Sequence, residues 1–393
     1  MVKFKNQISK VQILTLFTIP LIPHYFISSN VHTDDLPVLF FLILFLLNFY
    51  FNKKFKLFYK ELIPLIMFIL YIAIQNFSLN GEIFSSDFFR YLFYLAVFLT
   101  ILNIHETIKF DNFYFYLFIF VTSFSIGCYF LELDFGSDFY DYWKIGFNRN
   151  DWGFTTGRIN GLQAGGPNAF GGLIACLGVY CISHLSDVKR NIVIILGVIG
   201  CFFTYSRASL LVLFVFSFLF LLYIKNYYSI VILLISLIFT TFFGLTDRFS
   251  SELETEGIED RVQMQQATLT NINERKPIEN LFGYGFGNYG VVRNSVQNID
   301  DFDHSLRPTG PHNSFLFIIL NYGFVGLFLF FNIFLSPLLY FLKNIKKNIL
   351  SPRYLFLGCF VSLSFTGDFI QNHSISVLFF LTLFTTVSSL NEK

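Results

Sequence analysis

The stretch FLFIILNYGFVGLFLFFNIFL, residues 315–335, decides the fold class. It has no charged side chain and is long enough to cross a lipid core about 30 Å thick, because such a core requires roughly 20 helical residues. Other unbroken apolar runs, such as residues 230–243, recur along the chain. An outer-membrane barrel would instead show alternating segments of about ten residues. The sequence therefore predicts an all-α polytopic integral membrane protein.

The composition excludes two other classes of protein. Of the 393 residues, 54% are apolar and 13% are charged, and 57 are Phe, which a water-soluble domain with a charged surface does not accommodate. The net charge is +1, and the basic residues are dispersed between the apolar runs, so no basic stripe for nucleic acid is present. The five cysteines lie in or beside apolar runs without a pairing pattern or metal-type spacing, which predicts buried small residues.

Charged residues divide the chain into about 12 transmembrane helices. The first run, interrupted by Pro20 and Pro23, has no convincing cleavage site and is expected to remain as the first span. The expected spans are residues 11–30, 36–51, 61–79, 89–105, 112–133, 162–185, 191–205, 207–224, 228–246, 314–342, 353–370 and 373–390.

The distribution of basic residues predicts the orientation. With both termini in the cytoplasm, the cytoplasmic connections contain 14 lysines and 2 arginines, and the outer side contains 2 lysines and 9 arginines. Lysine and arginine set the orientation of a membrane protein equally well. The preference for arginine on the outer side therefore suggests a separate function, such as bidentate binding of phosphate. The alternative is that the outer loops use arginine for solubility.

Two long connections lie on the outer side of this arrangement, at residues 134–161 and 247–313. Loops beyond about 15 residues are usually functional or disordered. The second loop is punctuated by Gly, Pro and aromatic residues, which favours a long structured loop folded over the outer face of the membrane. The whole chain, 1–393, is predicted to be a single transmembrane domain. The absence of a convincing internal repeat disfavours a secondary transporter.

Two residues stand out as candidate catalytic groups. His312, in the segment PHNS at 311–314, lies where the long loop re-enters the membrane, and a neutral imidazole there could accept a proton from a sugar hydroxyl. A capping or loop histidine is the alternative. Arg207 joins two apolar runs with almost no loop between them, and a charge at the edge of the bilayer is a functional hypothesis by default. Snorkelling of Arg207 towards lipid headgroups is the alternative.

Further polar residues are supporting candidates. Arg261 opens a possible amphipathic helix, residues 261–272, with Val262, Leu269 and Ile272 on or near one face, and an ordinary surface salt bridge would explain Arg261 equally well. Arg158 and Asn168 flank a Gly-rich entry into the sixth span, which suits either a half-helix directed at an anion or a plain helix breaker.

Three other segments of the outer half contain polar residues or short motifs that could bind a ligand. Asp368 lies near the outer end of the eleventh span, where a carboxylate is expected to face a polar cavity or an arginine. The segment GFGNYG at 285–290 has the letters of a dinucleotide fingerprint but no preceding strand, so no cofactor is predicted. The segment DFD at 301–303 has the spacing of some cation sites, but a solvated acidic turn explains it as well, and no metal is predicted.

Four segments together resemble the O-antigen polymerase and O-antigen ligase superfamily of bacterial membrane glycosyltransferases. They are residues 158–168, the segment YSRA at 205–208, the glycine run GYGFGN at 283–288, and PHNS at 311–314 followed by NYGFVG at 321–326. Ten residues separate the histidine at 312 from the glycine at 323, which is similar to the spacing in that family.

The resemblance implies a metal-independent and inverting glycosyl transfer on the periplasmic face of a bacterial inner membrane. The long loop at 247–313 would then be a structured periplasmic loop that forms part of the active site. Arg207 and Arg261 would hold the diphosphate of an undecaprenyl-diphosphate-linked oligosaccharide, and His312 would be the base. The predicted substrate-binding residues are Arg158, Asn168, Asn313 and Asp368.

The predicted activity is an O-antigen polymerase whose donor and acceptor are both lipid-linked. A ligase to lipid A-core and a flippase of lipid-linked sugars are the alternatives. A chain-length regulator is a candidate partner, besides membrane lipid.

Overall fold

The protein is described by a computed structural model. The structure describes residues 2–22, 26–28, 31–32, 35–52, 56, 59–81, 83–103, 111–133, 147–148, 158–159, 161, 166–240, 242, 262, 264–266, 268–285, 311–345, 350–367, 369–370 and 373–391.

Most of the described residues are helical, which confirms the all-α class. In chain order the helices are α1 (Val2–Thr18), α2 (Asp35–Phe51), α3 (Ile63–Asn80), α4 (Ser86–Asn103), α5 (Asp111–Leu131), α6 (Gly166–His184), α7 (Asp187–Phe203), α8 (Arg207–Tyr223), α9 (Tyr227–Thr240), α12 (Pro277–Phe282), α14 (Ser314–Lys343), α16 (Pro352–Ser364) and α17 (His373–Asn391). Short 3-10 turns lie at η1 (Ile19–Leu21) and η2 (Lys60–Leu62). Two short antiparallel pairs complete the described elements: β1 (Phe26–Ser28) with β2 (Val31–His32), and β3 (Phe147–Asn148) with β4 (Arg158–Ile159).

Each of the twelve predicted spans overlaps one of these helices. Among the residues that the structure describes, four helical segments are long and apolar enough to cross a membrane: Lys60–Asn80, Asn112–Leu131, Gly166–His184 and Ser314–Lys343. Shorter apolar helices include α2, α8 and α9. For the remaining segments the membrane-spanning assignment stays a prediction.

The boundaries of the first span were predicted wrongly. The helix α1 begins at Val2 and ends at Thr18, whereas the expected span ran from residue 11 to residue 30. A proline at position 20 falls in the 3-10 turn that follows, because proline lacks the amide hydrogen needed to continue an α-helix. The residues beyond this turn include the β1–β2 pair instead of further helix.

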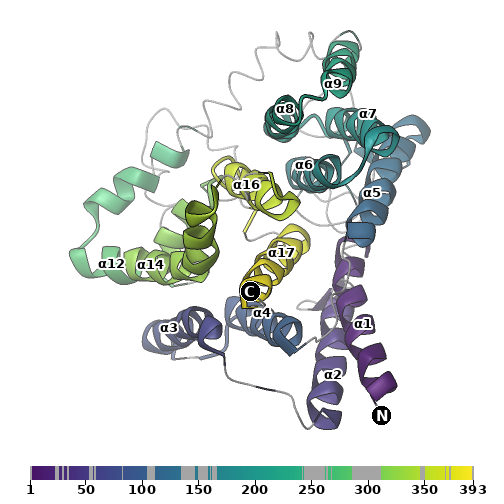
Figure 1. Ribbon diagram of the computed structural model, residues 1–393. Helices are drawn as coiled ribbons and strands as arrows, with labels where there is room; N and C mark the ends of the chain where they lie inside the picture. The colour runs from purple at the N-terminus through teal and green to yellow at the C-terminus, as the bar shows by residue number, and fades with distance from the viewer. Residues whose placement is uncertain are drawn as a thin grey trace.

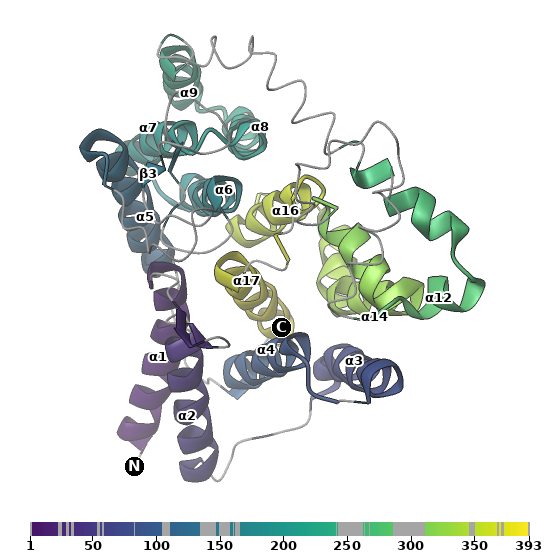
Figure 2. The ribbon, with the colours of Figure 1, turned by 180° about the vertical axis from the view of Figure 1, so that it is seen from behind.

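The helix α17 lies at the centre of the bundle, between α4, α6 and α16 (Figures 1 and 2). Its residues 375–387 are all buried, and its aromatic side chains stack on neighbouring helices. The rings of Phe379 and Phe360 of α16 are 3.9 Å apart, and those of Phe384 and Phe98 of α4 are 4.1 Å apart, measured between centroids. All five cysteines are buried, as predicted.

The two arginines predicted to face the cytoplasm donate to backbone carbonyls of helices, and Arg190 does so at a helix end. Arg190 donates from Nε to the carbonyl of Ile182 (2.9 Å) and from Nη2 to that of Leu185 (2.6 Å), at the end of α6. Arg353 donates to the carbonyl of Thr385, near the end of α17 (3.1 Å). A cation in this position complements the negative end of the helix dipole.

The three apolar residues of the loop helix predicted at 261–272 differ in burial. Residues 264–266 and 268–274 are helical, but Val262 and Leu269 are exposed, and Ile272 is buried together with Met264 against Leu320 of α14. The apolar residues divide between two faces of the helix, and contact with α14 selects the face that contains Met264. The spacing of apolar residues in the sequence did not reveal that this helix packs against Leu320 of α14.

Candidate functional site

Arg207 is the first residue of α8 and follows a tight turn at residues 204–206. Tyr205 adopts a left-handed conformation (φ 51°), and the hydroxyls of Ser206 and Ser209 are hydrogen-bonded at 2.7 Å. The turn packs against the first residues of α6, where a Cβ at Gly171 would lie only 2.6 Å from Thr204 Oγ1. Only glycine permits this approach, which places the half-buried Arg207 at the end of the bundle where α6 begins.

A hydrogen bond joins the amino ends of α6 and α8 directly. The hydroxyl of Ser209 donates to the backbone carbonyl of Asn168 at 3.5 Å. Asn168 is half-buried in the first turn of α6. Both helices therefore begin side by side, with Arg207 at the start of one and Asn168 at the start of the other.

The segment 311–314 forms the amino end of α14. His312 is half-buried and has a left-handed backbone (φ 46°). The side-chain oxygen of Asn313 caps the helix by accepting from the amides of Phe315 (3.0 Å) and Leu316 (3.2 Å). A capping asparagine satisfies amides that have no partner within the helix.

Ser314 and Phe369 connect the start of α14 to the start of α6. The Ser314 hydroxyl donates to the carbonyl of Gly367 (2.9 Å) and accepts from the amide of Ile370 (3.2 Å), in the turn that follows α16. In the same turn, the ring of Phe369 packs on α6, where a Cβ at Gly172 would lie 2.1 Å from it. The amino ends of α6, α8 and α14 therefore lie at one end of the bundle.

This end of the bundle is electrostatically suited to an anion. Each helix amino end carries a partial positive charge of about half an elementary charge and presents amides that lack partners within the helix. Arg207 adds a full positive charge, and His312 adds an imidazole, which can accept or donate a proton. The structure thus brings together the ends that carry Arg207, Asn168, His312 and Asn313, whose roles in catalysis and binding remain predictions.

The other predicted site residues are placed in part or not at all. Arg261 and Asp368 lie outside the described residues. The backbone of Arg158 pairs with Asn148 in the β3–β4 pair, and the structure describes nothing of its side chain. Nearby, Gly161 is so close to the Phe170 ring that a Cβ would lie 2.3 Å from it, so this segment reaches the start of α6.

The helix α14 is broken at Gly323, which the sequence analysis did not predict. Gly323 has φ 63° and ψ −171°, so the carbonyls before it lose their helical partners. The amide of Tyr284 donates to the carbonyl of Leu320 (3.0 Å), and that of Gly285 donates to the carbonyl of Asn321 (2.9 Å). A Cβ on Gly323 would lie 2.3 Å from the carbonyl oxygen of Leu281. Two of the segments that gave the family resemblance, 283–288 and 321–326, therefore contact each other here.

Two side chains of α3 bind the same break. The hydroxyl of Tyr71 donates to the carbonyls of Tyr322 (2.6 Å) and Phe282 (3.0 Å). The amide nitrogen of Gln75 donates to the carbonyls of Asn321 (2.7 Å) and Phe282. The break in α14 is thus held from α3 on one side and from the 283–285 segment on the other.

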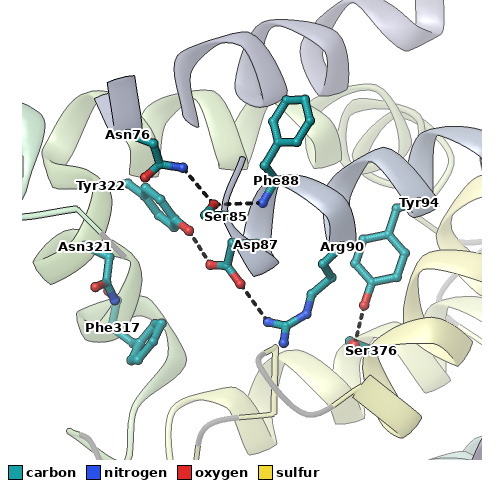
Figure 3. A network of polar contacts seen from close by, with 10 residues as sticks. All are labelled: Asn76, Ser85, Asp87, Phe88, Arg90, Tyr94, Phe317, Asn321, Tyr322 and Ser376. Atoms are coloured by element: carbon teal, nitrogen blue, oxygen red, sulfur yellow. Dashed lines mark hydrogen bonds and ion pairs between the residues drawn. The ribbon is translucent and has the colours of Figure 1, made fainter. Parts of the chain in front are cut away.

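Sequence reasoning also missed a buried polar network between α4 and α14 (Figure 3). Asp87 is 2% exposed and accepts from Arg90 at 2.9 Å and from the hydroxyl of Tyr322. Beside it, the hydroxyls of Tyr94 and Ser376 are 2.5 Å apart. An acidic and a basic residue three positions apart at the start of an apolar helix was the available signal. The network holds Tyr322 directly before the break.

The segment from α7 to the middle of α14 contains Arg207, His312 and both sides of the break. Residues 192–331 match the O-antigen ligase family. The match covers 140 residues, a little over one third of the chain, and confirms the resemblance to the O-antigen polymerase and ligase superfamily. Members of this family are membrane glycosyltransferase-like enzymes, and the apolar helices agree with a membrane protein. The family match alone does not distinguish a polymerase from a ligase. No curated protein matches the chain.

Proposed function

We propose that this protein is an O-antigen polymerase, which transfers a growing glycan from undecaprenyl diphosphate to a new lipid-linked repeat unit. The observation that supports this function best is the common position of the amino ends of α6, α8 and α14, which carry Arg207 and His312. The family match over residues 192–331 supports the reaction class. The general resemblance of the chain favours a polymerase over a ligase.

The leaving group explains the need for positive charge. When the bond between the anomeric carbon and the phosphate oxygen breaks, its electron pair remains on the diphosphate, which becomes more negative. Arg207 and the three helix amino ends stabilise that charge more in the transition state than in the ground state, and so lower the barrier. Arg261 is proposed as a second arginine for the same group, with Arg158 and Asp368 as supporting residues. No step of this scheme requires a metal.

The acceptor requires a base. A sugar hydroxyl is a weak nucleophile, and a positioned base contributes roughly 10²–10⁴-fold to the rate in typical enzymes. His312 would take the hydroxyl proton while the oxygen attacks the anomeric carbon. The products are an extended glycan on the acceptor lipid, a free lipid diphosphate and a protonated imidazole. A single displacement of this kind inverts the anomeric centre.

The reaction is proposed to occur at the periplasmic face of a bacterial inner membrane, with both termini in the cytoplasm. This placement is supported by the distribution of 14 lysines and 2 arginines on one side and 2 lysines and 9 arginines on the other. The lipid tail of each substrate would remain in the bilayer while its head group reaches the amino ends of α6, α8 and α14.

A ligase that transfers the finished glycan to lipid A-core is the second candidate. The description of the matching family, O-antigen ligase, is the observation that favours it. Both reactions break the same glycosyl phosphate bond, so the same diphosphate and base chemistry serves either. The two functions differ in the acceptor.

Purified protein in detergent, incubated with lipid-linked repeat unit and with lipid A-core, tests the proposal. Mass spectrometry of the products should show lipid-linked glycans of two or more repeats without any membrane gradient. Glycan attached to lipid A-core would favour the ligase. Intact substrate with neither product would contradict both enzymes. Transport of lipid-linked sugar without transfer, measured with the protein in sealed lipid vesicles, would favour a flippase.

Two variants test the catalytic assignments in the same assay. Arg207→Lys keeps the charge but removes the bidentate fork, and His312→Ala removes the base. We expect each to abolish chain extension while the amount of protein in the membrane stays normal. Wild-type activity in either variant would remove that residue from the mechanism.

A further inference from the structure

Arg275 is a buried arginine that the reaction described above does not use. It follows the helical residues 268–274, and only 7% of its surface is exposed. Its Nε donates to Oδ1 of Asn271 at 2.9 Å. Its guanidinium lies over the ring of Tyr284, with 3.9 Å between the guanidinium carbon and the ring centroid. The stem and plane of the side chain are therefore fixed.

The two terminal nitrogens of Arg275 are buried and have no hydrogen-bond partner among the residues that the structure describes. Burial lowers the pKa of Arg275, and Tyr284 and Glu279 act in the opposite direction. A guanidinium nevertheless remains protonated near neutral pH. Leaving a buried charged donor unsatisfied costs more than a typical hydrogen bond contributes. A fixed fork of free donors is therefore complementary to an oxyanion, which accepts two parallel hydrogen bonds.

An unsatisfied acceptor lies in the same segment. The side-chain oxygen of Asn280, in α12 between Arg275 and Tyr284, is buried without a partner in the described structure. An anion only accepts hydrogen bonds, so it can satisfy the donors of Arg275 but not the side-chain oxygen of Asn280. A neutral hydroxyl can donate to that oxygen. Arg275, Asn280 and the aromatic ring of Tyr284 together match a ligand that bears an oxyanion beside a sugar ring.

The backbone of this cluster contacts α14 beyond its first turn. The amide of Tyr284 is bound to the carbonyl of Leu320, which places the cluster beside Leu320. Leu320 is six residues beyond Ser314, about 9 Å along a helix that rises 1.5 Å per residue. The backbone of Tyr284 therefore meets α14 more than one turn beyond the start of that helix. Ile278 of the adjoining α12 is 65% exposed, so the cluster borders an apolar surface.

We propose that Arg275, Tyr284 and Asn280 form a second substrate subsite, which binds an oxyanion carried by a lipid-linked glycan. The subsite rests on the proposed function, because it requires glycan substrates. Two sources supply the same chemistry: the phosphate of a lipid-linked substrate, or the carboxylate of an acidic sugar. The subsite holds one substrate while Arg207 faces the leaving diphosphate of the other.

Binding measurements on the purified full-length protein in detergent test this subsite without turnover. The anionic probes are farnesyl diphosphate and methyl glucuronoside, and their neutral controls are farnesol and methyl glucoside. The variant is Arg275→Met, with Arg275→Lys as a second variant that keeps the charge. We expect Arg275→Met to lose affinity for at least one anionic probe by about tenfold or more, because a hydrogen bond to a charged group is lost. Affinity for the neutral controls should not change.

The pattern of loss identifies the source of the oxyanion. A loss confined to farnesyl diphosphate assigns a lipid phosphate, and a loss confined to methyl glucuronoside assigns an acidic sugar. Unchanged affinity for both anionic probes in Arg275→Met and Arg275→Lys overturns the subsite. A wild type that binds through Arg275 but forms no glycan product would contradict the proposed function and not the subsite.

Thermal unfolding of the ligand-free protein separates a binding role from a structural one. Because the free terminal nitrogens of Arg275 are buried, Arg275→Met should unfold at the same temperature as the wild type or higher. A lower unfolding temperature together with unchanged affinities would assign Arg275 a purely structural role and would overturn the proposal.

Discussion

Replacing Tyr322 with phenylalanine removes a single hydroxyl from the buried network between α4 and α14. That hydroxyl donates to one carboxylate oxygen of Asp87, and Arg90 donates to the other. Tyr322 is 1% exposed and Asp87 is 2% exposed, so water does not replace the lost partner. The ring of the new phenylalanine keeps the edge contact with Phe68, whose centroid is 5.7 Å away. The substitution therefore isolates one hydrogen bond.

The expected loss of stability follows from the charge of the acceptor. A hydrogen bond to a charged group contributes about 1.5–3 kcal/mol to the free energy of unfolding. Tyr322→Phe should lower that free energy by this amount. Tyr50→Phe is the matched control, because Tyr50 is 78% exposed and a surface change of this kind stays within about 0.5 kcal/mol.

A double-mutant cycle measures the interaction directly. The free energy of unfolding is obtained by denaturant titration of the protein in detergent for Tyr322→Phe, Asp87→Asn and the double variant. Residues in contact show coupling energies of about 0.5–3 kcal/mol, whereas independent residues add. Additive effects, or a loss in Tyr322→Phe no greater than in Tyr50→Phe, would refute the assignment of this network as a stabilising contact.

Three further outcomes are expected. Gly323→Ala should lower the unfolding temperature, because the new Cβ would lie 2.3 Å from a backbone oxygen and because the backbone at this position has φ 63°. Gly127→Ala is the control: Gly127 has open space around it, so this variant should unfold at the wild-type temperature or higher. Gly171→Ala should reduce glycan transfer more than stability, because its Cβ would displace the turn before Arg207; equal activity of this variant and the wild type would contradict that placement. A chelator should not affect the rate, and activity restored by magnesium or manganese would point to cation ligands at 301–303.

Local patterns predicted the helices well and their contacts poorly. The uncharged run at 315–335 identified α14, because helix length and hydropathy depend on neighbouring residues alone. The break at Gly323 was not predicted, since a glycine within an apolar run is often tolerated in a helix. Its backbone partners, Tyr284 and Gly285, lie nearly forty residues earlier in the chain. Such a contact is set by tertiary packing.

The candidate site was predicted in part for the same reason. Arg207 and His312 were singled out because a charge or a proline–histidine pair at the edge of an apolar run is visible locally. The bond between Ser314 and Gly367, which fixes the start of α14, joins residues far apart in sequence. Arg275 resembled any loop arginine, because its burial depends on the position of Tyr284.

The position of a bound lipid diphosphate tests the proposed mechanism most directly. An experimental structure should be determined with the protein in a lipid nanodisc and a non-hydrolysable isoprenyl diphosphate analogue. We expect its phosphates to accept hydrogen bonds from Arg207 at the amino ends of α6 and α8, with the imidazole of His312 beside the same phosphates. An analogue bound elsewhere, or Arg207 and His312 pointing into separate regions, would contradict the mechanism.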